Sequence, residues 1–405
     1  MKPPLVLILI LLWIQSLFAQ NKHGGVTKHW LCSVKIQDKT IDFVLSSNSS
    51  VTKIPNYILW NGRERIDLYN NKRIGDSLHC PVSVFESKLI LPLQPIEKFA
   101  GYYITSKNQR LPFSAVQLTT TKRTNSNPDL ESNQKFKGTW KIYFHQGGLA
   151  TDSGILITTL KSDSIYGTIL TETGDYRYLN GKINAENTAY LQTLDGAHNY
   201  RFDIKLVKDS IVGTFIYRPK GTDLFYGIKT QNAIQKSGFE AFKTTGAVKF
   251  NFTGSDETGR KINEQHVGFK NKGLVLQILG TWCPNCLDET RFLTEAYANK
   301  PKNVEFIGLA FERNPEHKAA FERINVLRAK LKVPYQIYLG GIANKDSAKL
   351  VVPFLSKVFA FPTTVFVKAD GSILKVHSGF SGPATGKLYT EWKKTFYEIL
   401  KEITP

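Results

Sequence analysis

The pentapeptide Trp-Cys-Pro-Asn-Cys at residues 282–286 constrains the fold of this chain more than any other stretch of its sequence. It follows the apolar run 273–279, which has the length and composition of a buried strand, and it precedes residues 287–293, which have helical spacing. The pattern predicts a strand that turns into a helix, with Cys283 at the turn and Cys286 one helical turn further along.

The positions of the two cysteines favour sulfur chemistry. At the first turn of a helix, unpaired backbone N–H groups and the helix dipole stabilise an anion, so we expect the pKa of Cys283 to lie below that of a free cysteine. Pro284 suits the start of a helix because it has no N–H group that needs a partner. Cys283 is therefore the predicted attacking thiol, and Cys286 is close enough to resolve a mixed disulfide.

Two other interpretations of the cysteine pair involve no redox chemistry. Half of a zinc site has the same C-x-x-C spacing, but it needs a second pair of Cys or His ligands nearby. The nearest histidines, His266 and His317, do not have metal-ligand spacing relative to the pair. Inert thiols are the remaining alternative. We expect a redox-active disulfide between Cys283 and Cys286, and we expect neither a metal ion nor a separate cofactor.

The segments after the pair extend the pattern. A strand-like run at 304–311 is followed by helical spacing over 345–359, by the stretch Phe-Pro-Thr-Thr-Val-Phe-Val at 361–367 and by helical spacing over 387–403. In this order the sequence resembles the TlpA/ResA-like branch of the thioredoxin superfamily, in which W-C-x-x-C is followed by a strand, an inserted segment and a proline-threonine strand. The resemblance extends from about Phe250 to the C-terminus, and it implies an α/β thioredoxin-like domain with thiol–disulfide oxidoreductase activity.

The same resemblance implies which residues meet the substrate. Pro362 matches the cis-proline whose loop faces the cysteine pair and keeps a backbone edge open for a substrate strand. Without the resemblance, a trans proline at the start of an ordinary strand is the default interpretation. We expect Trp282, Pro284, Phe361 and Pro362 to form the substrate-binding surface, with disulfides of other proteins as substrates.

A proton acceptor for Cys286 is the next requirement. Many thioredoxins carry a buried acid on the strand before the cysteines, but the corresponding residue here is Gln277, whose neutral amide cannot accept the thiol proton. Reductases of the TlpA/ResA-like branch have a glutamate at the end of the strand that matches 304–311, so the resemblance implies Glu312 as the base that deprotonates Cys286. A solvated glutamate at the end of a strand is the alternative.

Residues 1–20 have the pattern of a secretory signal peptide, with Lys2, then an apolar run from Leu5 to Phe18, then Ala19. The apolar run is too short to span a membrane comfortably, and the cleavage region has no cysteine that would carry a lipid anchor. We expect a soluble mature chain in an oxidising compartment, and the resemblance suggests a bacterial periplasm.

The formal net charge of +19 raises the hypothesis of nucleic-acid binding. The lysines are spread along the chain, and the signal peptide takes the chain away from nucleic acid. We therefore expect lysine-rich solvated faces and no nucleic-acid partner. Loose peripheral contact with an anionic membrane surface is compatible with the same charge.

The residues before the cysteine domain are rich in β-branched and aromatic types, with Asn-Gly and Asp-Gly turn signals and few helical stripes. We expect mainly antiparallel β structure in two modules, joined by a polar linker of little apolar content. The predicted boundaries are 1–20 for the signal peptide, 21–120 for the first β-rich module, 121–135 for the linker, 136–243 for a meander or barrel-like module and 244–405 for the thioredoxin-like domain.

One internal repeat supports the second β module. The sequence Asp-Ser-Ile-Tyr-Gly-Thr-Ile at 163–169 recurs as Asp-Ser-Ile-Val-Gly-Thr-Phe at 209–215. Each copy has the composition of a tight turn that opens a strand, so the two copies predict equivalent hairpins in an antiparallel meander.

Two further cysteines, Cys32 and Cys80, lie in strand-like stretches of the first module. After a signal peptide, an even number of cysteines favours a structural disulfide between them. Two unpaired, buried thiols that act as small apolar side chains are the alternative.

The predicted function is a secreted or periplasmic thiol–disulfide oxidoreductase that reduces disulfides of envelope proteins. Reduction is favoured over oxidation because Pro284 and Asn285 stand where strong oxidants and isomerases often carry a histidine. The family further implies a membrane thiol donor that re-reduces the pair. The rival hypothesis is an envelope binding protein that uses its β modules, with the thioredoxin-like part as a redox-sensitive scaffold.

Overall fold

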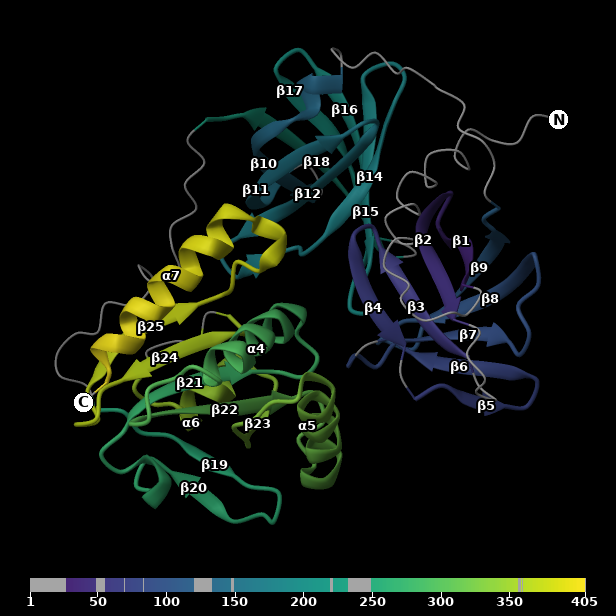
Figure 1. The fold of residues 1–405 in the computed structure, drawn as a ribbon. Helices are drawn as coiled ribbons and strands as arrows, with labels where there is room; N and C mark the ends of the chain where they lie inside the picture. The colour runs from purple at the N-terminus through teal and green to yellow at the C-terminus, as the bar shows by residue number, and fades with distance from the viewer. Residues whose placement is uncertain are drawn as a thin grey trace. The chain divides into compact units, whose positions relative to one another are not determined.

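Figure 1 shows the computed structural model, which describes residues 27–48, 55–68, 70–82, 84–119, 133–146, 149–218, 221–231, 249–355, 358 and 360–404. The predicted signal peptide lies outside these residues, and so does the predicted linker except for 133–135. In the described part of the chain, no helix is long and apolar enough to cross a membrane. The chain divides into two compact units, of which the first holds Met1–Asp152, Thr158–Gly167 and Tyr178–Lys229, and the second holds Ser153–Ile157, Thr168–Arg177 and Thr230–Pro405.

The first sheet has the strand order β4-β3-β2-β1-β9-β8-β7-β6-β5, and every neighbouring pair is antiparallel. Alternate residues of its strands face a core that includes Trp30, Phe43 and Leu59, as the two-residue period of a strand requires. The strands are β1 Thr27–Ile36, β2 Lys39–Asn48, β3 Asn56–Asn61, β4 Glu64–Leu68, β5 Lys72–Ile74, β6 Ser77–Pro81, β7 Lys88–Pro92, β8 Lys98–Ile104 and β9 Arg110–Gln117.

The second sheet is a meander with the strand order β11-β10-β18-β17-β16-β15-β14-β12-β13, and β11 also pairs with β12. The additional pairing closes the strands into a ring, so the barrel-like expectation for this region is consistent with the structure. A single 3₁₀ turn, η1 Gln134–Phe136, precedes it. The strands are β10 Gly138–Gln146, β11 Leu149–Lys161, β12 Ser164–Thr171, β13 Gly174–Asp175, β14 Leu179–Asn184, β15 Thr188–Leu194, β16 Asn199–Val207, β17 Ser210–Arg218 and β18 Gly221–Lys229.

The internal repeat marks two equivalent turns of this sheet. Ser162 and Lys208 precede the two copies, and both adopt the left-handed conformation, with φ of 58° and 53°. A residue in this conformation lets the chain reverse within two residues, and β12 and β17 begin at the serine of each copy. The prediction of equivalent hairpins is confirmed.

The sheet of the second unit is mixed, with the order β20-β19-β23-β22-β21-β24-β25. β21 and β22 are parallel, as are β22 and β23, whereas β24 and β25 are antiparallel to their neighbours. The predicted α/β class is therefore confirmed. The strands are β19 Thr253–Ser255, β20 Lys261–Asn263, β21 Gly273–Leu279, β22 Val304–Glu312, β23 Gln336–Ile342, β24 Thr363–Val367 and β25 Ile373–Ser378.

In the described part of this unit, four α-helices cover the sheet: α4 Pro284–Tyr297, α5 His317–Leu331, α6 Lys345–Val351 and α7 Lys387–Glu402. The 3₁₀ turns η2 Val267–Phe269 and η3 Pro383–Thr385 lie in the connections. α4 and α7 lie on one face of the sheet (Figure 1). They pack together there, because the centroid of the Phe292 ring lies 6.5 Å from that of Trp392 and 4.8 Å from that of Phe396. α6 is shorter than the predicted helix over 345–359. It ends before Pro353, which has no N–H to donate and disfavours a helical conformation at Val352.

Cys32 and Cys80 are not bridged, which corrects the expected disulfide. Both are free, fully buried thiols in the core of the first sheet. They lie on β1 and β6, which are separated in the strand order by β9, β8 and β7. Burial raises the pKa of Cys80 to about 12 and that of Cys32 well above its ordinary value. They therefore pack as small apolar side chains.

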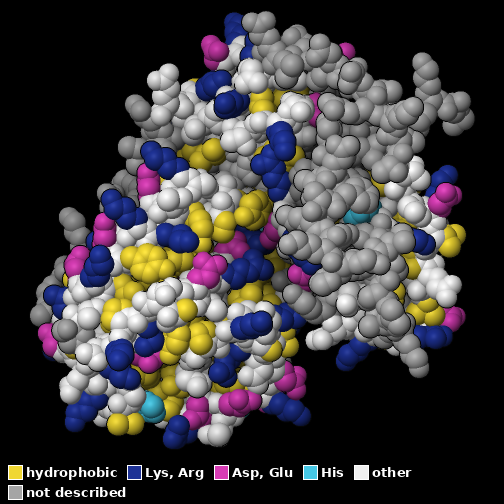
Figure 2. Space-filling model, in the orientation of Figure 1, with side chains coloured by type: hydrophobic (Ala, Val, Ile, Leu, Met, Phe, Trp, Pro, Cys, Tyr) yellow, Lys and Arg dark blue, Asp and Glu magenta, His cyan; other side chains and the backbone are white. Residues whose placement is uncertain are grey.

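Charged side chains are dispersed over the surface. Figure 2 shows Lys and Arg side chains spread over the face in view, with Asp and Glu among them. On this face, positive charge is therefore spread over many separate positions.

Candidate active site

Cys283 is the N-cap residue of α4, in the position that the pentapeptide predicted. Its extended backbone, with φ of −95°, ends the loop after β21, and Pro284 is the first helical residue. The Sγ atom accepts a hydrogen bond from the backbone N–H of Cys286 at 3.2 Å. A sulfur atom thus fills the role that a serine or aspartate oxygen fills at many helix N-termini. This geometry directs a backbone donor at the sulfur that is predicted to attack.

Cys286 lies deeper, and its side chain is 1% exposed. Burial raises the pKa of the Cys286 thiol well above its ordinary value, and the adjacent Cys283 and Glu289 act in the same direction. The buried thiol therefore needs a proton acceptor before it can attack a mixed disulfide.

The predicted substrate-side residues meet around Cys283. The Phe361–Pro362 peptide bond is cis, as expected, and the Cys283 thiol donates to the Phe361 carbonyl oxygen at 3.4 Å. The Trp282 ring lies edge-on to the Phe361 ring at 5.6 Å, and its Nε1–H donates to the Phe311 carbonyl oxygen. These contacts bring together the loop before α4, the end of β22 and the residues before β24.

Glu312 is buried at the end of β22, so it is not the solvated strand-end residue of the alternative interpretation. Its Oε1 accepts the backbone N–H of Thr281 at 2.9 Å, and its Oε2 accepts the Thr281 hydroxyl at 2.7 Å. The carboxylate thus holds the turn that delivers Cys283. Its role as the base for Cys286 stays a prediction.

A second buried acid, Glu289, was not identified from the sequence. It lies on α4 three residues after Cys286, it is fully buried, and its charge acts on the Cys286 thiol. Its carboxylate accepts the Gln277 amide at 2.9 Å and the Thr364 hydroxyl at 2.8 Å. Because these partners are neutral, burial dominates and raises the pKa of Glu289 to about 7. A carboxyl group with this pKa can exchange a proton near neutral pH.

Gln277 therefore has a role other than that of the acid it replaces. Besides Glu289, it accepts the Thr290 hydroxyl at 3.0 Å and points its amide at the Cys286 carbonyl oxygen at 3.4 Å. The sequence signal for Glu289 was its spacing, since residues three apart on a helix share a face.

The described residues contain no group of three or more His, Cys, Asp or Glu placed to hold a metal ion.

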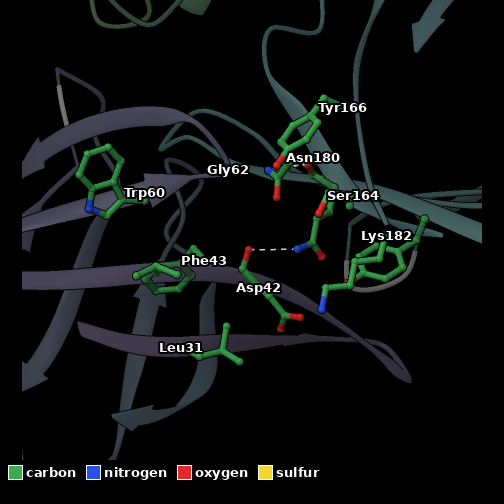
Figure 3. A pocket seen from close by; sticks show the side chains of 13 residues that line it. Leu31, Asp42, Phe43, Trp60, Gly62, Ser164, Tyr166, Asn180 and Lys182 are labelled. Carbon is green, nitrogen blue, oxygen red and sulfur yellow. Dashed lines mark hydrogen bonds between the residues drawn. The ribbon is translucent and has the colours of Figure 1, made fainter. Parts of the chain in front are cut away.

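The first unit contains a separate pocket, and all of its lining residues belong to that unit (Figure 3). Its space, including the mouth that opens to solvent, is about 620 Å³. The aromatic side chains in its lining are Phe43, Trp60, Tyr166 and Tyr190, and the charged ones are Asp42 and Lys182.

Two buried acceptors in this lining have no hydrogen-bond partner among the described residues: Asp42 Oδ1 and Gln192 Oε1. The Gln192 side chain is 3% exposed, and its amide donates to the Asp42 carbonyl oxygen at 3.0 Å, the dashed line in Figure 3. Lys182 is half-buried, and desolvation lowers its pKa. Buried acceptors without donors are costly, so this pocket is suited to a molecule that supplies donors.

Comparison with known proteins places the cysteine pair in a recognised family. Residues 243–388 match the Redoxin family model. A thiol-disulfide oxidoreductase ResA of Bacillus thuringiensis is 30% identical over 186 residues, which are 46% of this chain and 88% of the relative. A ResA of Bacillus cereus is 31% identical over 156 residues, 38% of this chain and 76% of the relative. A solved thiol-disulfide oxidoreductase from Bacteroides fragilis is 22% identical with a TM-score of 0.27, over 36% of this chain and 99% of that one.

Proposed function

Because the chain belongs to the family of the thiol-disulfide oxidoreductase ResA, we propose that it reduces disulfides of envelope proteins outside the cytoplasm through the Cys283–Cys286 pair. The observation that carries the proposal is the setting of Cys283. Its Sγ receives the N–H of Cys286 at the start of α4 and lies 3.4 Å from the Phe361 carbonyl oxygen. An anion at this position is stabilised by the helix terminus.

The reaction consists of two exchanges. The Cys283 thiolate attacks one sulfur of the substrate disulfide, so a mixed disulfide forms and the second substrate sulfur leaves as a thiolate that takes up a proton. Glu289 then accepts the proton of Cys286, and the Cys286 thiolate attacks Cys283 Sγ. The mixed disulfide breaks, the Cys283–Cys286 disulfide forms, and the substrate sulfur that Cys283 attacked leaves as a thiolate, which takes up the proton held by Glu289. Two electrons and two protons have passed to the substrate, and a membrane thiol donor returns the pair to the dithiol state.

Substitution of each cysteine tests this order of events. We expect Cys283→Ser to abolish the reduction of insulin, and Cys286→Ser to accumulate a mixed disulfide that non-reducing gels and mass spectrometry detect. Cys80→Ser is the matched control, because Cys80 is a buried thiol of the first unit and the cysteine pair belongs to the second. Full activity in Cys283→Ser would end the proposal.

The direction of transfer is tested by the reduction potential of the pair, measured by equilibration with glutathione. We expect a value nearer to the roughly −270 mV of thioredoxin than to the roughly −120 mV of the oxidant DsbA. A value near the second figure would make the protein an oxidant, although the chemistry at Cys283 would be unchanged.

The pocket of the first unit favours a second candidate function, which is binding of a small polyhydroxylated molecule. Hydroxyl groups would supply donors to Asp42 Oδ1 and Gln192 Oε1, while the aromatic lining would cover the apolar face of such a ligand. Calorimetric titration with glucose tests this, with glycine as the zwitterionic comparison. Asp42→Asn should weaken glucose binding, whereas Asp38→Asn, at an exposed position, should not. No binding of glucose at millimolar concentration would remove this candidate.

A further inference from the structure

The hairpin Thr168–Arg177 belongs to the same compact unit as the cysteine pair, although it precedes that pair by more than a hundred residues. It consists of the end of β12 and the short strand β13, with Leu170 opposite Asp175 and Thr171 opposite Gly174. The Thr171 hydroxyl donates to the Gly174 carbonyl oxygen at 2.9 Å and closes the tip. The tip is therefore a defined structure whose backbone can pack against a neighbour.

That neighbour is Asn285, the residue between Pro284 and Cys286. A Cβ atom placed on Gly174 would lie 2.0 Å from Asn285 Nδ2 and 3.3 Å from the Phe380 carbonyl oxygen. Gly174 also has φ of +139°, which favours glycine. The hairpin backbone thus lies directly on the side chain of the active-site turn, and the Asn285 Oδ1 atom is buried.

The tip of the hairpin also contacts Gly379, which is hydrogen-bonded to the cis-proline Pro362. A Cβ atom on Gly379 would lie 2.9 Å from the Thr173 carbonyl carbon, and the Gly379 N–H donates to the Pro362 carbonyl oxygen at 2.8 Å. The hairpin therefore contacts both the active-site turn and the loop that is hydrogen-bonded to Pro362.

A buried ion pair anchors the hairpin. Arg177 donates to Asp288 from Nε to Oδ2 at 2.8 Å and from Nη2 to Oδ1 at 3.2 Å, and the two side chains are 1% and 4% exposed. Two parallel bonds of this kind fix orientation as well as distance. Asp175 adds a second connection, because its Oδ2 accepts the backbone N–H of Gly382 at 2.5 Å.

We propose that this hairpin is a specificity-determining wall of the substrate site, which favours small disulfides and disulfides in extended flexible segments over those held in compact folded proteins. The inference rests on the proposed function, in which Cys283 is the attacking thiol. It follows from the contact of the hairpin with Asn285 and the Pro362 loop, together with the low exposure of Cys283, at 4%. A bulky partner therefore reaches this sulfur less readily than a small disulfide does while the hairpin is in place.

The test compares Arg177→Met, which releases the anchor, with Arg291→Met, which removes the other and more exposed partner of Asp288. For each variant, kcat/KM is measured with native insulin and with oxidised glutathione. We expect the insulin-to-glutathione ratio to rise about tenfold in Arg177→Met, a size typical of altered pocket contacts, and to stay constant in Arg291→Met. In Arg177→Met, relative to the unmodified chain, the rate of Cys283 alkylation by a bulky maleimide should rise more than the rate of its alkylation by the small reagent iodoacetamide.

Gly174→Ala provides an independent variant should Arg177→Met fail to fold, because its added methyl group displaces the tip from Asn285 with the ion pair intact. The ratio should rise here also. If the insulin-to-glutathione ratio is unchanged in a folded variant that still reduces glutathione, the hairpin does not determine specificity, and the proposed function is unaffected. Absence of both insulin and glutathione reduction by the unmodified chain would instead overturn the proposed function.

Discussion

Two adjacent buried carboxyl groups on α4, Asp288 and Glu289, point about 100° apart around the helix and differ in their partners. Asp288 meets two guanidinium groups, with Arg177 Nε at 2.8 Å and Arg291 Nη1 at 3.0 Å. Among the described residues, Glu289 accepts hydrogen bonds from the amide of Gln277 and the hydroxyl of Thr364, and both of these partners are neutral. Burial is almost complete for both side chains, so the charge of the partners is what distinguishes the two environments.

The difference shows how one helix can serve two purposes. Cationic partners compensate the charge of Asp288, which makes it an attachment point for the hairpin. Neutral partners leave burial uncompensated at Glu289 and raise its pKa to about 7, which makes it a group that can take and release a proton. The first turns of α4 thus carry an anchor at Asp288 and a proton acceptor at Glu289, on different faces of the helix.

The largest expected effect is on the anchor. Arg177→Met leaves Asp288 with only its more exposed partner, and breaking a buried ion pair costs about 3 kcal/mol or more of the free energy of unfolding. Urea unfolding followed by tryptophan fluorescence measures this loss. Arg65→Met is the matched control, since Arg65 and its partner Asp67 are 53% and 33% exposed. A loss in Arg177→Met as small as that in the control would mean that the anchor contributes little.

The next effect is on the proton acceptor. We expect Glu289→Gln to slow the resolution of the mixed disulfide about a hundredfold, the lower range for loss of a general base. Quenched-flow mass spectrometry follows the decay of the intermediate. Glu312→Gln is the informative comparison, because its carboxylate is held by Thr281. If Glu312→Gln slows resolution more than Glu289→Gln does, the base implied by the family resemblance is the correct one.

A smaller effect is on the pH dependence of stability. The pKa of Glu289 is raised from 4.5 to about 7 in the folded chain, so its stabilising contribution is complete below about 4.5 and is lost as the pH rises towards 7. We expect a loss of about 2 kcal/mol across this interval. Asp175, whose pKa burial raises to about 6, acts in the same direction, so the measurement is made in Asp175→Asn. Adding Glu289→Gln to this variant should flatten the remaining dependence of the free energy of unfolding on pH. If the dependence persists, it arises from other groups.

The smallest effect is expected for Arg291→Gln. Arg291 is 43% exposed, and a solvated ion pair contributes about 0.5 kcal/mol or less. Urea unfolding should separate this variant clearly from Arg177→Met. Equal losses in the two would show that Asp288 depends on both guanidinium groups alike, and the contrast between the two sides of α4 would weaken.

The sequence predicted the features whose signals are local. The turn at Cys283, the α/β order of the second unit and the helix α7 at Lys387–Glu402 each follow from residues within a few positions of one another. α6 was predicted too long because helical spacing continues past Pro353, where the backbone cannot follow it. The prediction followed the spacing of the apolar residues, although Pro353 disfavours a helical conformation at Val352.

Features that depend on distant segments could not be predicted in the same way. Glu289 stands visibly three residues after Cys286, but its neutral surroundings come from Gln277 on β21 and Thr364 on β24. The partner of Asp288 lies 111 residues earlier in the chain. The two cysteines of the first module have the even count of a disulfide, yet the strand order separates them. In each case the decisive neighbour is set by the tertiary structure.

The closure of the second sheet limits how a partner could add a strand to this protein. Pairing of β11 with both β10 and β12 closes the ring, so the two-residue β13 is the remaining edge of this sheet in the described part of the chain. The sheet of the second unit ends in β20 and β25, of three and six residues. At one end of the first sheet, the three residues of β5 are all exposed and two of them are the basic Lys72 and Arg73. Such short or charged edges resist uncontrolled strand addition, and so they protect the chain against edge-to-edge aggregation.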